Sequence, residues 1–96
     1  MIASISEIKE LVSLVYAAGM MRAWTEMKVY PDKIRRKEAE KKLVSEGYEK
    51  QTLDKWVKNF LVKEYVGDKK NSPRTYSINE IYQMVIAIKL KKIVQG

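Results

Sequence analysis

The chain has 96 residues, 46% of them hydrophobic, and carries 19 lysines and arginines against 12 aspartates and glutamates. This length predicts one domain, residues 1–96, with a modest core and no second domain. Because there is no cysteine and no histidine, disulfides and thiolate metal sites are excluded, and we expect neither a metal nor another cofactor.

The apolar runs are far shorter than the ~20 residues that span a bilayer. The N-terminus, MIASISEIKE, has acidic residues where a signal peptide would be basic. We therefore expect a cytoplasmic protein with no membrane contact.

Charge is distributed unevenly along the chain. Residues 1–27 hold two basic and three acidic residues, a net of −1, so the remaining residues carry +8 and the whole chain +7. Lysines concentrated in one region, with a pI of about 9.6, are typical of a protein that binds a polyanion, most often nucleic acid.

The first predicted element is a helix over residues 1–28. Ser4 followed by Glu7 fits a capping box, so the helix should begin near Ile5. Two apolar stripes run along it: Ile5, Ile8, Val12, Val15, Gly19 and Ala23, and beside them Leu11, Leu14, Ala18 and Met21. An apolar face this wide predicts a second burial partner, either another copy of the chain or the rest of its own domain.

Residues 32–60 are predicted to form a helix-turn-helix. Pro31 ends the first helix, because proline disfavours a helical residue before it and lacks the amide donor. The segment KIRRKEAEKKLVSEG follows as a short helix whose inward positions are Ile34, Ala39 and Leu43. Its alternating charges are equally typical of a solvated face. Gly47 is expected to end it in the left-handed conformation.

The stretch GYEKQTLDKWVKNF, from Gly47 to Phe60, is the main functional signal. Its apolar residues recur at spacings of three and four, which places Leu53, Trp56, Val57 and Phe60 on one helical face. The opposite face carries Gln51, Thr52, Asp54, Lys55 and Lys58. Such a helix is suited to a DNA groove, although an ordinary surface helix has the same pattern.

Residues 61–78 are predicted to form a β-hairpin. LVKEYV alternates as a strand does, GDKKNSP contains turn residues, and RTYSI returns as a second strand. Ser77 and Glu80 form another capping box, which predicts a last helix over residues 78–94. This helix is apolar almost all round until Lys89, so it too requires two packing partners.

In this order the elements predict a mainly α fold with a small β-hairpin, a winged helix-turn-helix flanked by N-terminal and C-terminal helices. The segment from Ile34 to Ile81 resembles the MerR-type and phage-excisionase-type DNA-binding domains. IRRKEAEKKL is similar to the first helix of their motif, GYEKQTLDKWVKN to the turn and recognition helix, and GDKKNSPRTYSINEI to the wing. The ending KNSPRTYS is similar to that of small proteins from bacterial mobile elements.

The sequence departs from that family pattern in three places. The interval from Ala39 to Gly47 is a few residues longer than the usual compact turn, which alters the angle between the two helices. Phe60 stands where a glycine commonly ends the recognition helix. Asp54 is acidic on the face meant for DNA, where it would repel phosphate or accept from a cytosine amino group.

The resemblance implies that base edges are contacted by Gln51, Thr52 and Lys55. Their chemistry agrees, because glutamine pairs with adenine, lysine donates to guanine, and threonine offers a hydroxyl and a methyl. The implied phosphate contacts are Arg35, Arg36, Lys50, Lys58, Lys69, Lys70 and Arg74. Each of these cations is explained equally well as a solvated surface residue. Trp56 and Tyr76 are expected in the core.

The sequence therefore predicts a protein that binds double-stranded DNA through a recognition helix at about 50–60 and a basic wing. It would act as a transcription regulator or an excision accessory factor, dimerised through its terminal helices. The rival prediction is a protein interaction module that uses the apolar terminal helices and does not bind nucleic acid. RNA binding is a lesser rival, because the aromatic residues show no stacking platform.

No enzymatic activity and no small-molecule ligand are expected. There is no histidine or cysteine, no glycine loop that cradles phosphate, and no obvious carboxylate pair. A serine-lysine pair stays open, since Ser13, Ser45 and Ser72 accompany many lysines.

Overall fold

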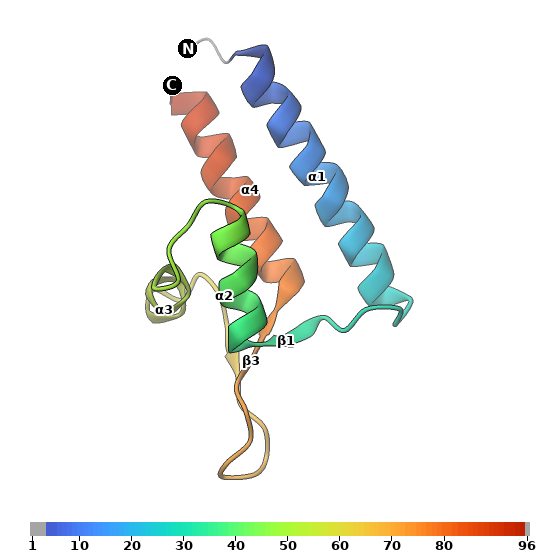
Figure 1. Cartoon of the computed structure of the whole chain (residues 1–96), viewed down its shortest axis with the longest axis vertical. Helices are drawn as coiled ribbons and strands as arrows, with labels where there is room; N and C mark the ends of the chain where they lie inside the picture. Colours follow the sequence, from blue (N-terminus) through green and yellow to red (C-terminus); the bar gives the residue numbers. More distant parts are fainter. Residues whose placement is uncertain (1–3, 96) are drawn as a thin grey trace.

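The computed structural model describes residues 4–95. In chain order its elements are α1 (Ile5–Glu26), β1 (Lys33–Arg35), α2 (Arg36–Ser45), α3 (Thr52–Lys58), β2 (Glu64–Tyr65), β3 (Thr75–Ser77) and α4 (Ile78–Gln95). The fold is mainly helical with one small antiparallel sheet, which confirms the predicted fold class. Figure 1 shows α1 and α4 at one end of the molecule, the hairpin projecting at the other, and α2 and α3 between them.

The sheet has three strands in the order β1-β3-β2, with both neighbouring pairs antiparallel. The expected placement of Ile34 on a helix is wrong, because Ile34 lies in β1 opposite Tyr76 and the helix begins only at Arg36. Three residues are too few to display the period of a strand, and the partner strand lies far along the chain. The hairpin is present, but its strands are shorter than the predicted LVKEYV and RTYSI.

The core lies where α2, α3, β3 and α4 meet. Its largest fully buried side chains are Tyr76, Leu43, Leu53, Ile81, Val62 and Val85. Ile34, Ala39 and Leu43 all point inward as predicted, and Trp56 is buried beneath α3. The periodicity therefore identified the inner side of this helix-turn-helix, although it misjudged the conformation at Ile34.

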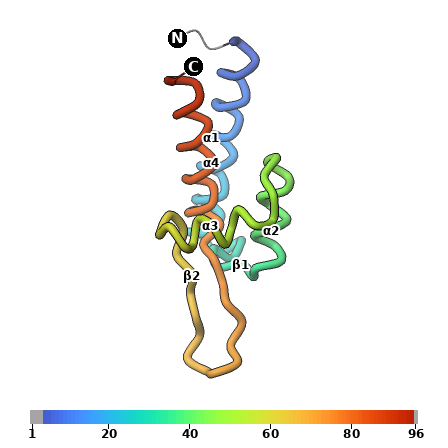
Figure 2. Tube along the Cα trace, turned by 90° about the vertical axis from the view of Figure 1, so that its left-hand side faces the viewer, coloured from blue at the N-terminus to red at the C-terminus, as the bar shows by residue number. Residues whose placement is uncertain are grey.

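The helices α1 and α4 run side by side in opposite directions (Figures 1 and 2). The predicted capping box of α1 is confirmed, since the Glu7 amide donates to the Ser4 hydroxyl (3.1 Å) and the Ser4 amide to the Glu7 carboxylate (3.3 Å). Only Leu14 and Ala18 of α1 are buried. The α1 helix thus contributes a narrow stripe to the core.

Asp32 joins the end of α1 to the start of α4. Its carboxylate accepts hydrogen bonds from the Ser77 hydroxyl (2.8 Å) and the Asn79 side-chain amide (2.9 Å), and the same Asn79 amide donates to the Thr25 hydroxyl of α1 (2.9 Å). Burial raises the pKa of Asp32, but the bonds from Ser77 and Asn79 and the nearby Lys33 outweigh it and hold the pKa below its ordinary value. A charged carboxylate therefore fixes the helix pair to the sheet.

Two left-handed residues bracket α3. Gly47 has a φ of 91°, as predicted, and Phe60 has a φ of 59°. The residue after each of them donates its amide back to the preceding helix. Tyr48 donates to the Leu43 carbonyl of α2 (2.9 Å), and Leu61 donates to the Trp56 carbonyl of α3 (2.8 Å). This is the Schellman arrangement. The prediction that Phe60 lies on the inner face is wrong, because the reversal turns its side chain outward and leaves it 95% exposed.

We predict that Phe60→Gly stabilises the fold. A left-handed residue other than glycine costs about 1 kcal/mol, and the exposed ring gives no burial in return. The substitution should raise the melting temperature, measured by circular dichroism, by roughly 4–8 °C in a domain of this size. Phe60→Ala is the control, because it removes the ring but keeps the strained backbone. An equal rise for both variants would assign the effect to the ring instead.

Candidate nucleic-acid interface

The α3 helix is held to the core by one side and exposes the other. Leu53 and Trp56 are buried, and the ring of Tyr48 meets that of Trp56 edge-on with centroids 5.5 Å apart. The predicted base-contacting residues lie at the start of the helix and on its outer side: Gln51 and Lys55 are exposed and Thr52 is half-buried. The structure therefore presents these three side chains from one short, anchored helix.

An ion-pair cluster fixes α3 against α2. The Arg36 guanidinium bonds to Asp54 of α3 and to Glu40 of its own helix (3.1 Å). The hydrogen bond to Asp54 raises the pKa of Arg36 above its ordinary value. The charge of Asp54 is therefore offset by Arg36, which it shares with Glu40. Sequence spacing does not reveal this pairing, because the partners are 18 positions apart.

The same cluster reaches the hairpin through Tyr76. The Tyr76 hydroxyl donates to the Glu64 carboxylate (2.6 Å) and lies 3.5 Å from an Arg36 nitrogen. Glu64 also accepts from the Arg74 guanidinium (2.6 Å). Burial, followed by the bond to Glu64, raises the pKa of Tyr76 to about 12. Helix α3 and the base of the hairpin are thus tied to one buried residue.

A second link joins the hairpin to α4. The Glu80 carboxylate accepts from the Tyr65 hydroxyl (2.8 Å) and from the Lys63 amide (3.0 Å), and the bond from Tyr65 raises the pKa of that tyrosine. The second predicted capping box is therefore only half formed. The Glu80 amide donates to the Ser77 hydroxyl (3.2 Å), but the Glu80 side chain accepts its hydrogen bonds from the hairpin side.

The tip of the hairpin is a tight turn that carries two lysines. The Lys69 carbonyl accepts from the Ser72 amide (3.0 Å), and the Ser72 hydroxyl accepts from the Lys69 amide (3.2 Å). A Cβ at Gly67 would meet Ser72 at 2.6 Å, so the close approach of the two hairpin arms requires glycine there. Lys69 and Lys70 are both exposed at this tip, as a phosphate-binding wing requires.

A shallow basic groove of about 550 Å³ lies along the outer side of α2. Two predicted phosphate contacts, Arg35 and Lys50, line it together with Lys37 and Lys41, which were not predicted as contacts, and with Glu38, Glu40 and Val44. The signal for Lys37 and Lys41 was present in the basic run that opens α2, but the same run also fits a solvated face.

The predicted phosphate contacts fall into two groups. Arg36 and Arg74 are already engaged with carboxylates. Within residues 4–95 no ion pair occupies the other five, which are Arg35, Lys50, Lys58, Lys69 and Lys70. Only the second group can meet an anion without first losing an internal partner.

Comparisons of the chain with protein-family models, curated proteins and solved structures give no match. Among the residues that the structure describes, no helix is long and apolar enough to cross a membrane, and no cluster of acidic residues could hold a metal ion.

We predict that Tyr76→Phe changes how stability depends on pH. Because the folded pKa of about 12 lies above the ordinary value of 10, the hydroxyl stabilises the fold fully below pH 10, and this contribution is lost as the pH rises through about 12. At neutral pH the free energy of unfolding of the variant should be about 1 kcal/mol lower than that of the unaltered protein. Urea unfolding of both proteins should show this difference shrinking near pH 12. A difference independent of pH would contradict the assignment.

Proposed function

We propose that this chain binds double-stranded DNA, as a transcription regulator or an excision accessory factor. The observation that carries the proposal is the anchored α3, which exposes Gln51, Lys55 and Lys58 beside a hairpin tipped with lysines. Helix α3 has seven residues, about two turns. An α-helix with its side chains is about 10–12 Å across, which the major groove, about 12 Å wide, admits.

Base edges are assigned to Gln51, Thr52 and Lys55. Gln51 is the N-cap of α3, Thr52 is its first residue and Lys55 lies one turn further on. The N-terminal part of a recognition helix is the part that contacts base edges. Glutamine is suited to adenine and lysine to guanine, so these residues would distinguish base pairs. Asp54 is given no reading role, because Arg36 holds its carboxylate.

Phosphate contacts are assigned to the cations that make no internal ion pair. Lys58, Lys69 and Lys70 flank the assigned base contacts along α3 and the hairpin, and Arg35 and Lys50 extend the basic surface over α2. Arg36 and Arg74 are assigned a positioning role instead, since they fix the angle of α3 and the base of the wing. Contacts of the first kind supply affinity without reading sequence.

The first experiment titrates the protein into a labelled random duplex of about 30 base pairs and follows fluorescence anisotropy at several salt concentrations. If roughly 6 to 10 phosphates are contacted, affinity should fall about a thousandfold or more between 50 and 200 mM salt. Absence of binding even at about 50 mM would refute the proposal and favour the protein interaction module.

We predict that Lys55→Ala and Lys69→Ala act differently on sites selected from a random pool. Lys55→Ala should cost about 1–3 kcal/mol on the preferred site and little on other sequences, because it removes a base contact. Lys69→Ala should weaken all duplexes similarly and lower the salt slope by about one. Lys9→Ala, an exposed lysine of α1, is the control and should change neither. Equal losses on every sequence from both changes would remove the base-reading role of α3.

A further inference from the structure

The side of α1 that faces away from α4 is apolar and exposed. We define the outer face of α1 as Ile5, Ile8, Val12, Val15, Tyr16 and Met20 of the helix together with its C-cap residue, Met27. Ile5, Tyr16 and Met27 are each at least 70% exposed. These residues form the first of the two stripes and its border, whereas the second stripe is the one that packs on α4.

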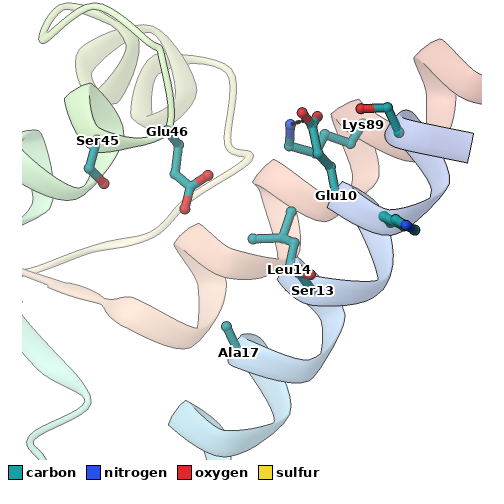
Figure 3. Close-up of a pocket in the computed structure, with 9 residues that line it drawn as sticks. Glu10, Ser13, Leu14, Ala17, Ser45, Glu46 and Lys89 are labelled. Atoms are coloured by element: carbon teal, nitrogen blue, oxygen red, sulfur yellow. Dashed lines mark ion pairs between the residues drawn. The ribbon is translucent and has the colours of Figure 1, made fainter.

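The domain itself covers α1 from one direction only. Leu14 and Ala18 are buried toward α4, and Glu10 pairs with Lys89 of α4 (3.7 Å). Toward α2 there is an open groove of about 580 Å³, with Ser13 and Ala17 on one wall and Ser45 on the other (Figure 3). Within residues 4–95 every side chain of the outer face is at least 36% exposed, so the described part of the chain does not cover this face.

The spacing of the apolar residues along the outer face is typical of a helix that packs against another helix. Ile5, Ile8, Val12, Val15 and Gly19 are separated by three, four, three and four residues, the repeat with which helices pair in coiled coils. A Cβ at Gly19 would meet nothing within 4 Å, although glycine inside a helix costs about 1 kcal/mol relative to alanine. The single chain gives no reason for this glycine, whereas close approach of a second helix does.

The exposed area matches what a stable dimer needs. Taking ~200 Å² for a fully exposed large side chain, the exposed fractions of the seven outer-face residues amount to on the order of 800 Å². A stable interface buries about 800 Å² on each partner, whereas the largest apolar patch of a typical monomer is about 300–600 Å². The whole outer face therefore fits one protein interface.

The charge distribution favours a second copy of the chain as the partner that covers the outer face. Residues 1–27 carry a net charge of −1 and the remainder of the chain +8. An acidic partner or an anionic membrane would be attracted to the basic surface and not to α1. Two copies that meet through α1 are in contact through the segment whose net charge is closest to zero, so like-charge repulsion is smaller there than between two lysine-rich surfaces.

We infer that the outer face of α1 packs against the outer face of α1 in a second copy and forms a homodimer. This inference does not depend on DNA binding, because the oligomeric state is measured without nucleic acid. Failure of the dimer and failure of the DNA proposal are therefore distinguishable.

Sedimentation velocity of the full chain between about 1 and 100 μM tests the inference. The mass obtained for the protein should be twice the 11.2 kDa of one chain. The double variant Val12→Lys, Val15→Lys should have the mass of a single chain. The matched control is Val44→Lys on α2, because Val44 and Val15 are 50% and 49% exposed on their helices. This control should remain a dimer.

A second variant keeps the test valid if the lysines disturb folding. Gly19→Leu favours the helix and adds apolar surface, but it blocks close approach, so it should weaken the dimer about tenfold or more. A single-chain mass for the unaltered protein at about 100 μM would overturn the inference. A dimer that survives the two lysines, or that Gly19→Leu strengthens, would overturn it as well.

Discussion

The arrangement of this protein depends on the burial of Tyr76. Its ring is fully buried, and its strand is the central one of the sheet, paired with β1 on one side and β2 on the other. Its hydroxyl meets Glu64 and Arg36, and through them the hairpin and α3. A buried hydroxyl must find partners, so satisfying this one group fixes the two elements that carry the candidate interface.

The same network divides the cations between two tasks. Arg36 pairs with both Asp54 and Glu40, and Arg74 pairs with Glu64, so the carboxylates near α3 and the base of the hairpin are engaged within the protein. The lysines of α3 and of the hairpin tip then supply the local excess of positive charge. Net charge alone did not predict this division, because it counts all cations alike. An anion is bound more readily by a lysine or arginine that does not first have to leave a carboxylate.

Local signals in the sequence were enough for the helices and not for the connections between them. Capping residues and apolar spacing located α1, α3 and α4, because both act within a few residues. Ile34 was misjudged because a three-residue strand is defined by a partner distant in sequence. Phe60 was misjudged because a backbone reversal, which glycine usually marks, takes place here at a phenylalanine. The candidate base contacts could be named, but the Arg36–Asp54 pair that orients them could not.

The apolar periodicity of α1 does not show which side of the helix is buried. It assigns residues to two stripes, and both stripes are apolar. The structure buries the stripe with Leu14 and Ala18 and leaves the stripe with Val12 and Val15 exposed. Leaving the stripe with Val12 and Val15 in water is unfavourable in proportion to its area, and the lysine-rich surface lies on other elements. The chain thus carries its exposed apolar stripe on α1 and the exposed lysines of the candidate interface on α3 and the hairpin, as two separate features.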